Sequence, residues 1–149
     1  MSRRLRRSLL LVPVLGLAAA CGESNNTTTP TGPSTPPTPI TVTFSGTLTR
    51  NSAYTHPFEV TDAGDVSVFL ISSADARNPE NNAIPIGVSL GTWNTLTSSC
   101  SIVIANDNIA PGASLFGRAT AAGNLCVRVY DVGYVPPGAA TYELLIDHY

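Results

Sequence analysis

Apolar and polar residues alternate along much of the chain from residue 40 onward, and this period of two restricts the fold more than any other feature. Ile40, Val42, Phe44 and Leu48 would share one face of an extended strand, with mostly Thr and Ser between them. Successive side chains of a β-strand point to opposite faces, so the pattern is typical of a half-buried strand. No segment keeps the 3.6-residue period of an amphipathic helix. We therefore predict an all-β domain.

Further strand candidates follow, separated by clusters of Asp, Asn, Gly and Pro that favour turns. Residues 54–60 alternate like the first segment, and residues 66–71 are apolar on both faces, as in a central strand. The remaining candidates are 84–90, 100–105, 114–119, 125–132 and 141–146. About eight short strands with such turns predict an antiparallel β-sandwich or jelly roll over residues 40–149.

The first twenty residues have the layout of a targeting segment. An arginine-rich start precedes an apolar run at 9–20, which Pro13 interrupts. That run is shorter than the roughly twenty apolar residues that a membrane-spanning helix needs. We interpret residues 1–20 as a cleaved signal peptide. The pair Arg6-Arg7 leaves open whether export follows the general secretory route or the twin-arginine route.

A cysteine follows small residues at the end of this segment. Residues 17–22 read Leu-Ala-Ala-Ala-Cys-Gly, which resembles the bacterial lipobox, although Ala18 stands where that motif usually has Leu. The resemblance implies a lipoprotein in which an acyl group such as palmitate anchors Cys21 to the membrane. Gly22, in place of the Asp that marks inner-membrane retention, favours the outer membrane. The alternative is an ordinary small-residue cleavage site.

Residues 21–39 combine this cysteine with a Ser/Thr/Pro-rich stretch. The stretch from 24 to 39 contains no large apolar side chain that could anchor it to a core. Such composition is typical of a disordered, extended linker. We predict that it holds the domain of residues 40–149 away from the membrane.

The distribution of charge excludes one class of partner. All ten acidic residues lie beyond position 22, whereas four of the eight basic residues lie in the first seven positions. After cleavage, four Arg remain against ten carboxylates, a formal charge of −6. Such a chain lacks the basic surface that neutralises phosphates. We expect no nucleic-acid partner.

The three cysteines have a simple interpretation. If Cys21 carries lipid, Cys100 and Cys126 remain as a pair, and export to an oxidising compartment favours a disulfide between them. A metal site is the alternative, but these two cysteines and the distant His56 and His148 have no metal-ligand spacing. We predict a disulfide, no metal and no cofactor.

The order of features in residues 40–149 resembles the bacterial pre-peptidase C-terminal (PPC) domain, a secreted β-sandwich module. That family has an early aromatic strand, here 54–60, and a Gly-Asp turn into an apolar strand, here 64–70. Its later strand of the form Gly-x-Tyr-x-Val-x-Val corresponds to 123–129, and its closing strand begins with Tyr, here Tyr142. The resemblance implies a sandwich fold and an extracellular setting. It does not extend to a peptidase domain.

One short segment matches the sequence of a catalytic motif. Residues 87–91 read Gly-Val-Ser-Leu-Gly, as in the nucleophile elbow of hydrolases. That chemistry requires Ser89 on a strand-to-helix turn with a His in reach, whereas Ser89 lies inside a predicted strand and His148 is close to the chain end, where chains usually fray. Oxygen-rich segments at 62–65 and 106–108 could bind Ca²⁺, but turn formation is the interpretation we favour. We predict no enzymatic activity.

Two aromatic residues are the candidates for ligand contact. Trp93, the only Trp, follows Gly-Thr in an expected loop, and Tyr134 lies in the Gly-Tyr-Val-Pro-Pro segment. Aromatic rings on loops are common contact anchors, although a lone Trp is also a common core residue. We predict a non-catalytic interaction module that contacts a neutral glycan or a protein through these loops. The alternative is a structural envelope lipoprotein without a dedicated ligand.

Overall fold

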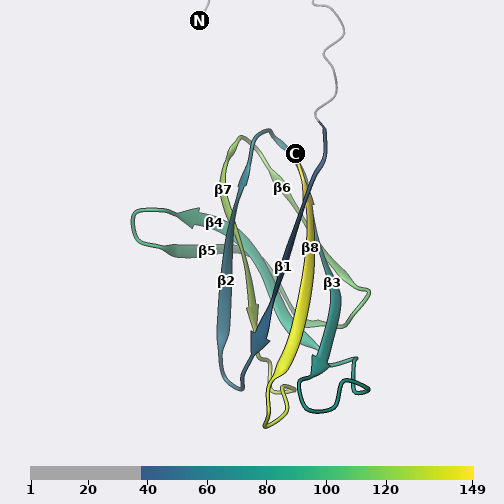
Figure 1. Ribbon diagram of the computed structural model, residues 1–149. Coiled ribbons are helices and arrows are strands. Elements are labelled where there is room, and N and C mark those ends of the chain that lie inside the picture. The colour runs from purple at the N-terminus through teal and green to yellow at the C-terminus, as the bar shows by residue number, and fades with distance from the viewer. Residues whose placement is uncertain (1–37) are drawn as a thin grey trace, which may run out of the picture. The chain divides into compact units, whose positions relative to one another are not determined.

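The alternating segments form eight β-strands in the computed structural model, which describes residues 38–149. The strands are β1 (Ile40–Leu48), β2 (Ala53–Val60), β3 (Gly64–Asp75), β4 (Ile86–Asn94), β5 (Ser99–Ile109), β6 (Ser114–Ala119), β7 (Gly123–Tyr130) and β8 (Ala140–His148) (Figure 1). Residues 38–149 contain no helix, which confirms the all-β prediction. None of the described residues belongs to a helix long and apolar enough to cross a membrane. The signal peptide, Cys21 and the linker up to residue 37 lie outside the described residues, so their predictions are not tested.

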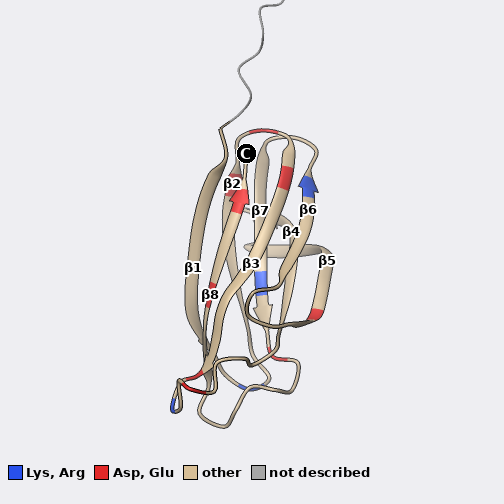
Figure 2. Cartoon of the chain, turned by 90° about the vertical axis from the view of Figure 1, so that its right-hand side faces the viewer, with Lys and Arg blue, Asp and Glu red and all other residues tan. Residues whose placement is uncertain are grey.

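The strands form two antiparallel four-stranded sheets, in the orders β1-β8-β3-β6 and β2-β7-β4-β5. Every connection except the β4–β5 hairpin passes from one sheet to the other. This is the arrangement of a jelly-roll sandwich. The predicted sandwich is therefore confirmed. Charged positions are sparse on the strands, as Figure 2 shows.

The hydrophobic core fills the space between the two sheets. In β4, Ile86, Val88 and Leu90 point into it, and in β7 Val127 and Val129 do the same; all five side chains are buried. Full burial of a Val, Leu or Ile side chain contributes roughly 1.5–3 kcal/mol. The side chains that alternate with these core residues point to the outer face of each sheet. The opposite sheet completes this core with Val66, Val68, Leu70, Tyr142, Leu144 and Ile146.

Two predicted loops are parts of strands. Trp93 lies within β4, and residues 106–108, expected as a turn, lie within β5. The pairing of β5 with β4 overrides the local turn preference: Ile86 pairs with Ile109 and Val88 with Asn106, so β5 has one residue more than β4 in this stretch. Such an extra residue is a β-bulge. The Asn106 side chain accepts the backbone N–H of Asn108 (2.9 Å) inside it, as it would in a turn.

Candidate functional site

A groove of about 430 Å³ lies on the outer face of the β2-β7-β4-β5 sheet. Its position follows from the sequence of β4, in which Gly87, Ser89 and Gly91 alternate with the core residues. Small outward residues on a central strand leave a depression between the larger side chains of its neighbours. The groove is lined by Asn51, Ser52, Ala53, Ser89, Ile102, Ala105, Arg128, Tyr130 and Asp131.

Tyr130 contributes an aromatic ring to this groove. The ring extends from β7 across Gly87 of β4, and its hydroxyl donates a hydrogen bond to the carboxylate of Asp107 on β5. Burial, followed by the hydrogen bond and the negative charge of Asp107, raises the pKa of Tyr130 to about 12. The phenol is therefore neutral at physiological pH, and contacts at both ends of the side chain fix the ring.

Asp131 holds one end of the groove together. Its carboxylate accepts the backbone N–H groups of Asn51 (2.9 Å), Gly133 (2.8 Å) and Val135 (3.2 Å). Burial raises the pKa of Asp131. The three hydrogen bonds and the charge of Arg50 lower it by more, so the pKa lies below its usual value. Asp131 therefore joins the β1–β2 turn to the β7–β8 loop, and its oxygens are already occupied by donors.

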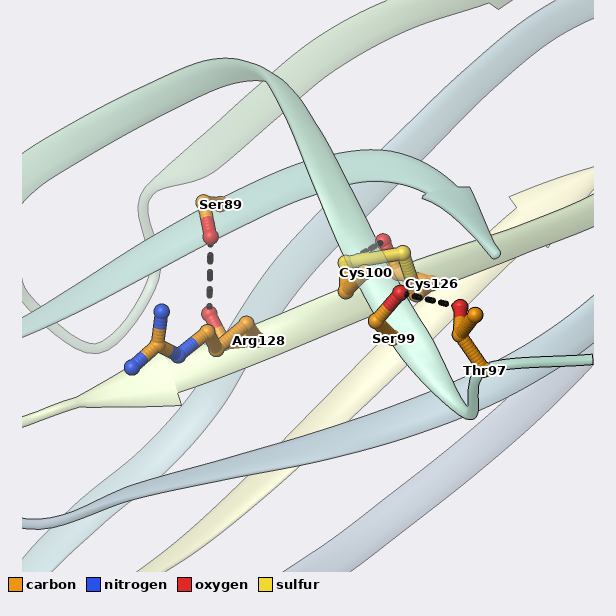
Figure 3. The surroundings of a disulfide bond; sticks show 6 residues. All are labelled: Ser89, Thr97, Ser99, Cys100, Cys126 and Arg128. Carbon is orange, nitrogen blue, oxygen red and sulfur yellow. Dashed lines mark hydrogen bonds between the residues drawn. A yellow bond between two sulfur atoms is a disulfide. The ribbon is translucent and has the colours of Figure 1, made fainter. Parts of the chain in front are cut away.

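Arg128 provides the positive charge of the groove. Its backbone carbonyl accepts a hydrogen bond from the Ser89 hydroxyl (3.5 Å; Figure 3). Its side chain is exposed. Within residues 38–149 the guanidinium forms no ion pair, because the one pair there joins Arg118 to Asp65 (2.7 Å). The groove thus contains an uncommitted guanidinium beside the Tyr130 ring.

The wall of the groove on the β5 side is tied down by the predicted disulfide. Cys100 of β5 and Cys126 of β7 are linked although β4 lies between these strands in the sheet (Figure 3). Gly91 of β4 is the register partner of Cys126, and a Cβ atom at Gly91 would lie 2.1 Å from the carbonyl oxygen of Ser101 in β5. Strand β5 therefore folds over β4, and Ile102, two residues after Cys100, becomes part of the wall.

The two aromatic residues singled out in the sequence do not form one site. Trp93 is half-buried in β4, opposite Cys100, whereas Tyr134 lies in the β7–β8 loop with 62% of its surface exposed. The register pairs Gly87 with Tyr130 near the β7–β8 loop and Thr92 with Leu125 at the other end of β7. Trp93 and Tyr134 therefore lie at opposite ends of this sheet, and neither lines the groove.

The residues of the hydrolase motif are also separated. Ser89 faces the groove in the middle of β4, whereas His148 belongs to β8 of the other sheet. His148 does not fray: it pairs with Ile40, is 2% exposed, and its ring centroid lies 5.4 Å from that of Phe58. The structure does not bring the two side chains together. Among the described residues, no group of three or more His, Cys, Asp or Glu side chains is arranged to hold a metal ion.

Sequence reasoning missed Tyr130 and Arg128 as members of a site. The signal that could have found them is the segment that suggested a nucleophile elbow. Glycine at 87 and 91 with serine at 89 leaves the outward face of a central strand nearly bare. Bare positions of this kind mark places where another group approaches the backbone closely.

Comparisons with known proteins show similarity at the level of fold. No family model matches the chain, and no curated protein matches it. A crystal structure of the Yersinia pseudotuberculosis-derived mitogen aligns with a TM-score of 0.51 and 14% identity, over 75% of this chain and 88% of that one. This likeness shows a shared fold alone.

The pre-peptidase C-terminal domain of a collagenase from Bacillus anthracis also aligns, with a TM-score of 0.47 and 17% identity, over 72% of this chain and 89% of that one. At this TM-score the alignment carries no argument about function. The PPC resemblance therefore rests on the sequence features described above.

Proposed function

We propose that this chain is an extracytoplasmic lipoprotein, anchored to the membrane through lipid on Cys21, whose β-sandwich is a non-catalytic module that binds a glycan. The observation that carries the proposal is the groove between Tyr130 and the β5 wall. Its volume of about 430 Å³ falls in the range of roughly 300–1,000 Å³ that is common for small-molecule sites. The PPC resemblance supports the same extracellular setting.

The chemistry of the groove suits a sugar ring. A sugar presents a weakly polar face of C–H groups and a rim of hydroxyls, so it needs an aromatic surface and several hydrogen-bonding groups. Tyr130 supplies the ring, and the exposed side chains of Asn51 and Arg128 supply hydrogen-bonding groups beside it. The sequence predicts a neutral glycan or a protein as the partner, whereas the groove itself contains a guanidinium.

The location of the protein is supported by two independent features. The lipobox-like segment at 17–22 implies export and acylation, and the Cys100–Cys126 disulfide is typical of an oxidising compartment. Gly22 favours the outer membrane. A protein held outside the cytoplasm in this way would meet envelope or extracellular polysaccharides.

The test fills the groove without removing any of its contacts. Ala105 is an exposed residue of the groove lining, so Ala105→Trp should occupy the space of the ligand. The full chain is screened against an array of neutral and acidic glycans, and hits are measured by calorimetry. We expect binding to the parent chain and at least a tenfold loss in Ala105→Trp.

Leu96→Trp is the matched control, because Leu96 lies at the tip of the β4–β5 hairpin with 95% of its surface exposed and is not part of the groove. It should bind like the parent. If neither the parent nor Leu96→Trp binds any glycan, the glycan proposal fails and the structural envelope protein becomes the better interpretation. Equal losses of glycan affinity in Ala105→Trp and Leu96→Trp would also contradict the glycan proposal.

A protein contact is the second candidate, and a specific observation favours it. The edge strand β5 exposes three successive apolar residues, Ile102 (43%), Val103 (77%) and Ile104 (39%). Exposed apolar side chains together on an edge strand are typical of contact surfaces. Val103→Asp should abolish such a contact while leaving glycan binding unchanged, which separates the two functions.

A further inference from the structure

Arg128 is the only cationic residue among those that line the groove, and its guanidinium is uncommitted within residues 38–149. Arg128 and Tyr130 are two residues apart in β7, so their side chains lie on the same face of the sheet, and both line the groove. A ligand in contact with the aromatic ring would also be within the influence of the guanidinium.

Two carboxylates at the groove, Asp131 of its lining and Asp107 on the Tyr130 hydroxyl, are already engaged. Asp107 accepts the hydroxyl of Tyr130, and Asp131 accepts three backbone N–H groups. Neither is in an ion pair with Arg128. The group that the groove leaves without a partner is thus a planar cation with five N–H donors, whose geometry matches a carboxylate through two parallel hydrogen bonds.

From this arrangement we infer the class of glycan that the groove takes: a saccharide that carries a carboxylate, such as a uronic acid, with its carboxylate on Arg128 and its ring against Tyr130. The inference rests on the proposed glycan-binding function and makes it more specific. It differs from the neutral glycan or protein that the sequence predicts as the partner. Net charge describes the whole surface, whereas selectivity depends on the charges that remain unpaired at the site.

The experiment uses pairs of ligands that differ only in charge. A short oligomer of galacturonic acid is compared with the same oligomer after complete methyl esterification, which keeps the shape and removes the negative charge. Dissociation constants for the oxidised full chain are measured by calorimetry at low and at physiological salt. Because a hydrogen bond to a charged group is strong, we expect the acid to bind about tenfold more tightly than the ester, and this ratio to fall as salt rises.

Arg128→Gln should reduce the affinity for the acid to that for the ester, and leave the affinity for the ester nearly unchanged. The matched control is Arg118→Gln, because it removes the same charge from an arginine that pairs with Asp65 and does not line the groove. It should keep the preference for the acid. Equal losses in the two variants would mean that overall charge, and not the site, causes the preference, and would overturn the inference.

The remaining outcomes separate this inference from the function on which it rests. If the acid and its ester bind equally well, the inference is wrong while the glycan module stands. If neither binds and no other glycan binds, both are wrong. Galacturonate monomer and acetate serve as further probes. An acetate affinity equal to that of the sugar acid would show that Arg128 binds any carboxylate and that the ring contact is absent, which would also contradict the inference.

Discussion

The ring of Tyr130 occupies the space that a side chain at Gly87 would need: a Cβ atom at Gly87 would lie 2.2 Å from the ring. Gly87 in β4 and Tyr130 in β7 lie directly opposite each other where these two strands pair. The glycine therefore allows the tyrosine to lie across the sheet and reach Asp107. The position of Tyr130 in the groove therefore depends on Gly87 having no side chain.

We predict that Gly87→Ala displaces Tyr130 and lowers the melting temperature. Excess volume at a closely packed position costs about 1–3 kcal/mol, and about 1 kcal/mol corresponds to several degrees in a domain of this size. Gly123→Ala is the control, since a Cβ atom there would have no heavy atom within 4 Å. Thermal unfolding followed by circular dichroism gives both values. Equal melting temperatures would show that the ring moves aside without cost.

The sequence allowed the strands to be predicted better than the site. Strands with a core on one side have an alternating pattern, as at Ile40–Leu48, and their number and class follow from it. The residue types at Trp93 and at 106–108 favour turns and exposed contacts, and so predict loops. Pairing between β4 and β5 outweighs those local preferences. Long-range pairing of this kind cannot be read from a window of neighbouring residues.

The groove was missed for a related reason. Its residues come from the β1–β2 turn, β2, β4, β5, β7 and the β7–β8 loop, several of which are far apart in the sequence. The disulfide could be predicted from the number of cysteines, but the crossing of β5 over β4 at Gly91 could not. This crossing of β5 over β4 places Ile102 in the lining of the groove. The site is thus a product of topology, and only its small residues are visible in advance.

The disulfide should contribute both to stability and to the groove. Closing a loop of about 25 residues stabilises a fold by roughly 3–4 kcal/mol in the chain-entropy model. Replacing Cys100 and Cys126 together by Ser should therefore lower the melting temperature by many degrees. Because β5 would no longer be held over β4, ligand affinity should also fall at temperatures where the variant is folded.

Thiol alkylation and mass spectrometry provide the independent measurement for the parent chain. Oxidised protein should contain no alkylatable thiol at Cys100 or Cys126, and reduction should reproduce the effect of the double substitution on the melting temperature. Two reactive thiols in exported protein would contradict the prediction. Unchanged ligand affinity after reduction would show that the β5 wall holds its position without the link.

His56 should make stability depend on pH. Its Nε2 atom lies 2.8 Å from the Tyr142 hydroxyl, its ring stacks on Phe44, and burial lowers the pKa of His56 from 6.5. Well above pH 6.5 the ring is neutral in the folded and in the unfolded chain. As the pH falls below 6.5, the unfolded chain binds a proton more readily than the folded one, so stability decreases toward the folded-state pKa.

The matched variant for this prediction is His56→Gln, which can keep a hydrogen bond to Tyr142 but does not titrate in this range. Urea unfolding is measured between pH 7.5 and pH 5 for both proteins. The parent should lose more stability than the variant over this interval. Parallel curves would mean that His56 contributes nothing to the pH dependence.

Trp93 and Tyr134 should now respond differently to substitution. Trp93 is half-buried in β4, so Trp93→Ala should destabilise the domain by removing buried surface. Tyr134 is 62% exposed, and Tyr134→Ala should leave the melting temperature unchanged. Neither lines the groove, so affinity per folded molecule should persist in both variants. Loss of glycan binding in Tyr134→Ala alone would restore the loop as the contact site.

The lipid anchor is the last prediction, and it depends on one residue. If Cys21 is acylated, the processed chain should fractionate with membranes and incorporate labelled palmitate. Cys21→Ser removes the thiol that accepts the lipid, so the variant should become soluble outside the cytoplasm or accumulate as the unprocessed precursor. The folded domain should be unaffected, because its disulfide uses Cys100 and Cys126. A Cys21→Ser protein that remains in the membrane fraction at the mass of the processed parent would show that another feature of the chain anchors it.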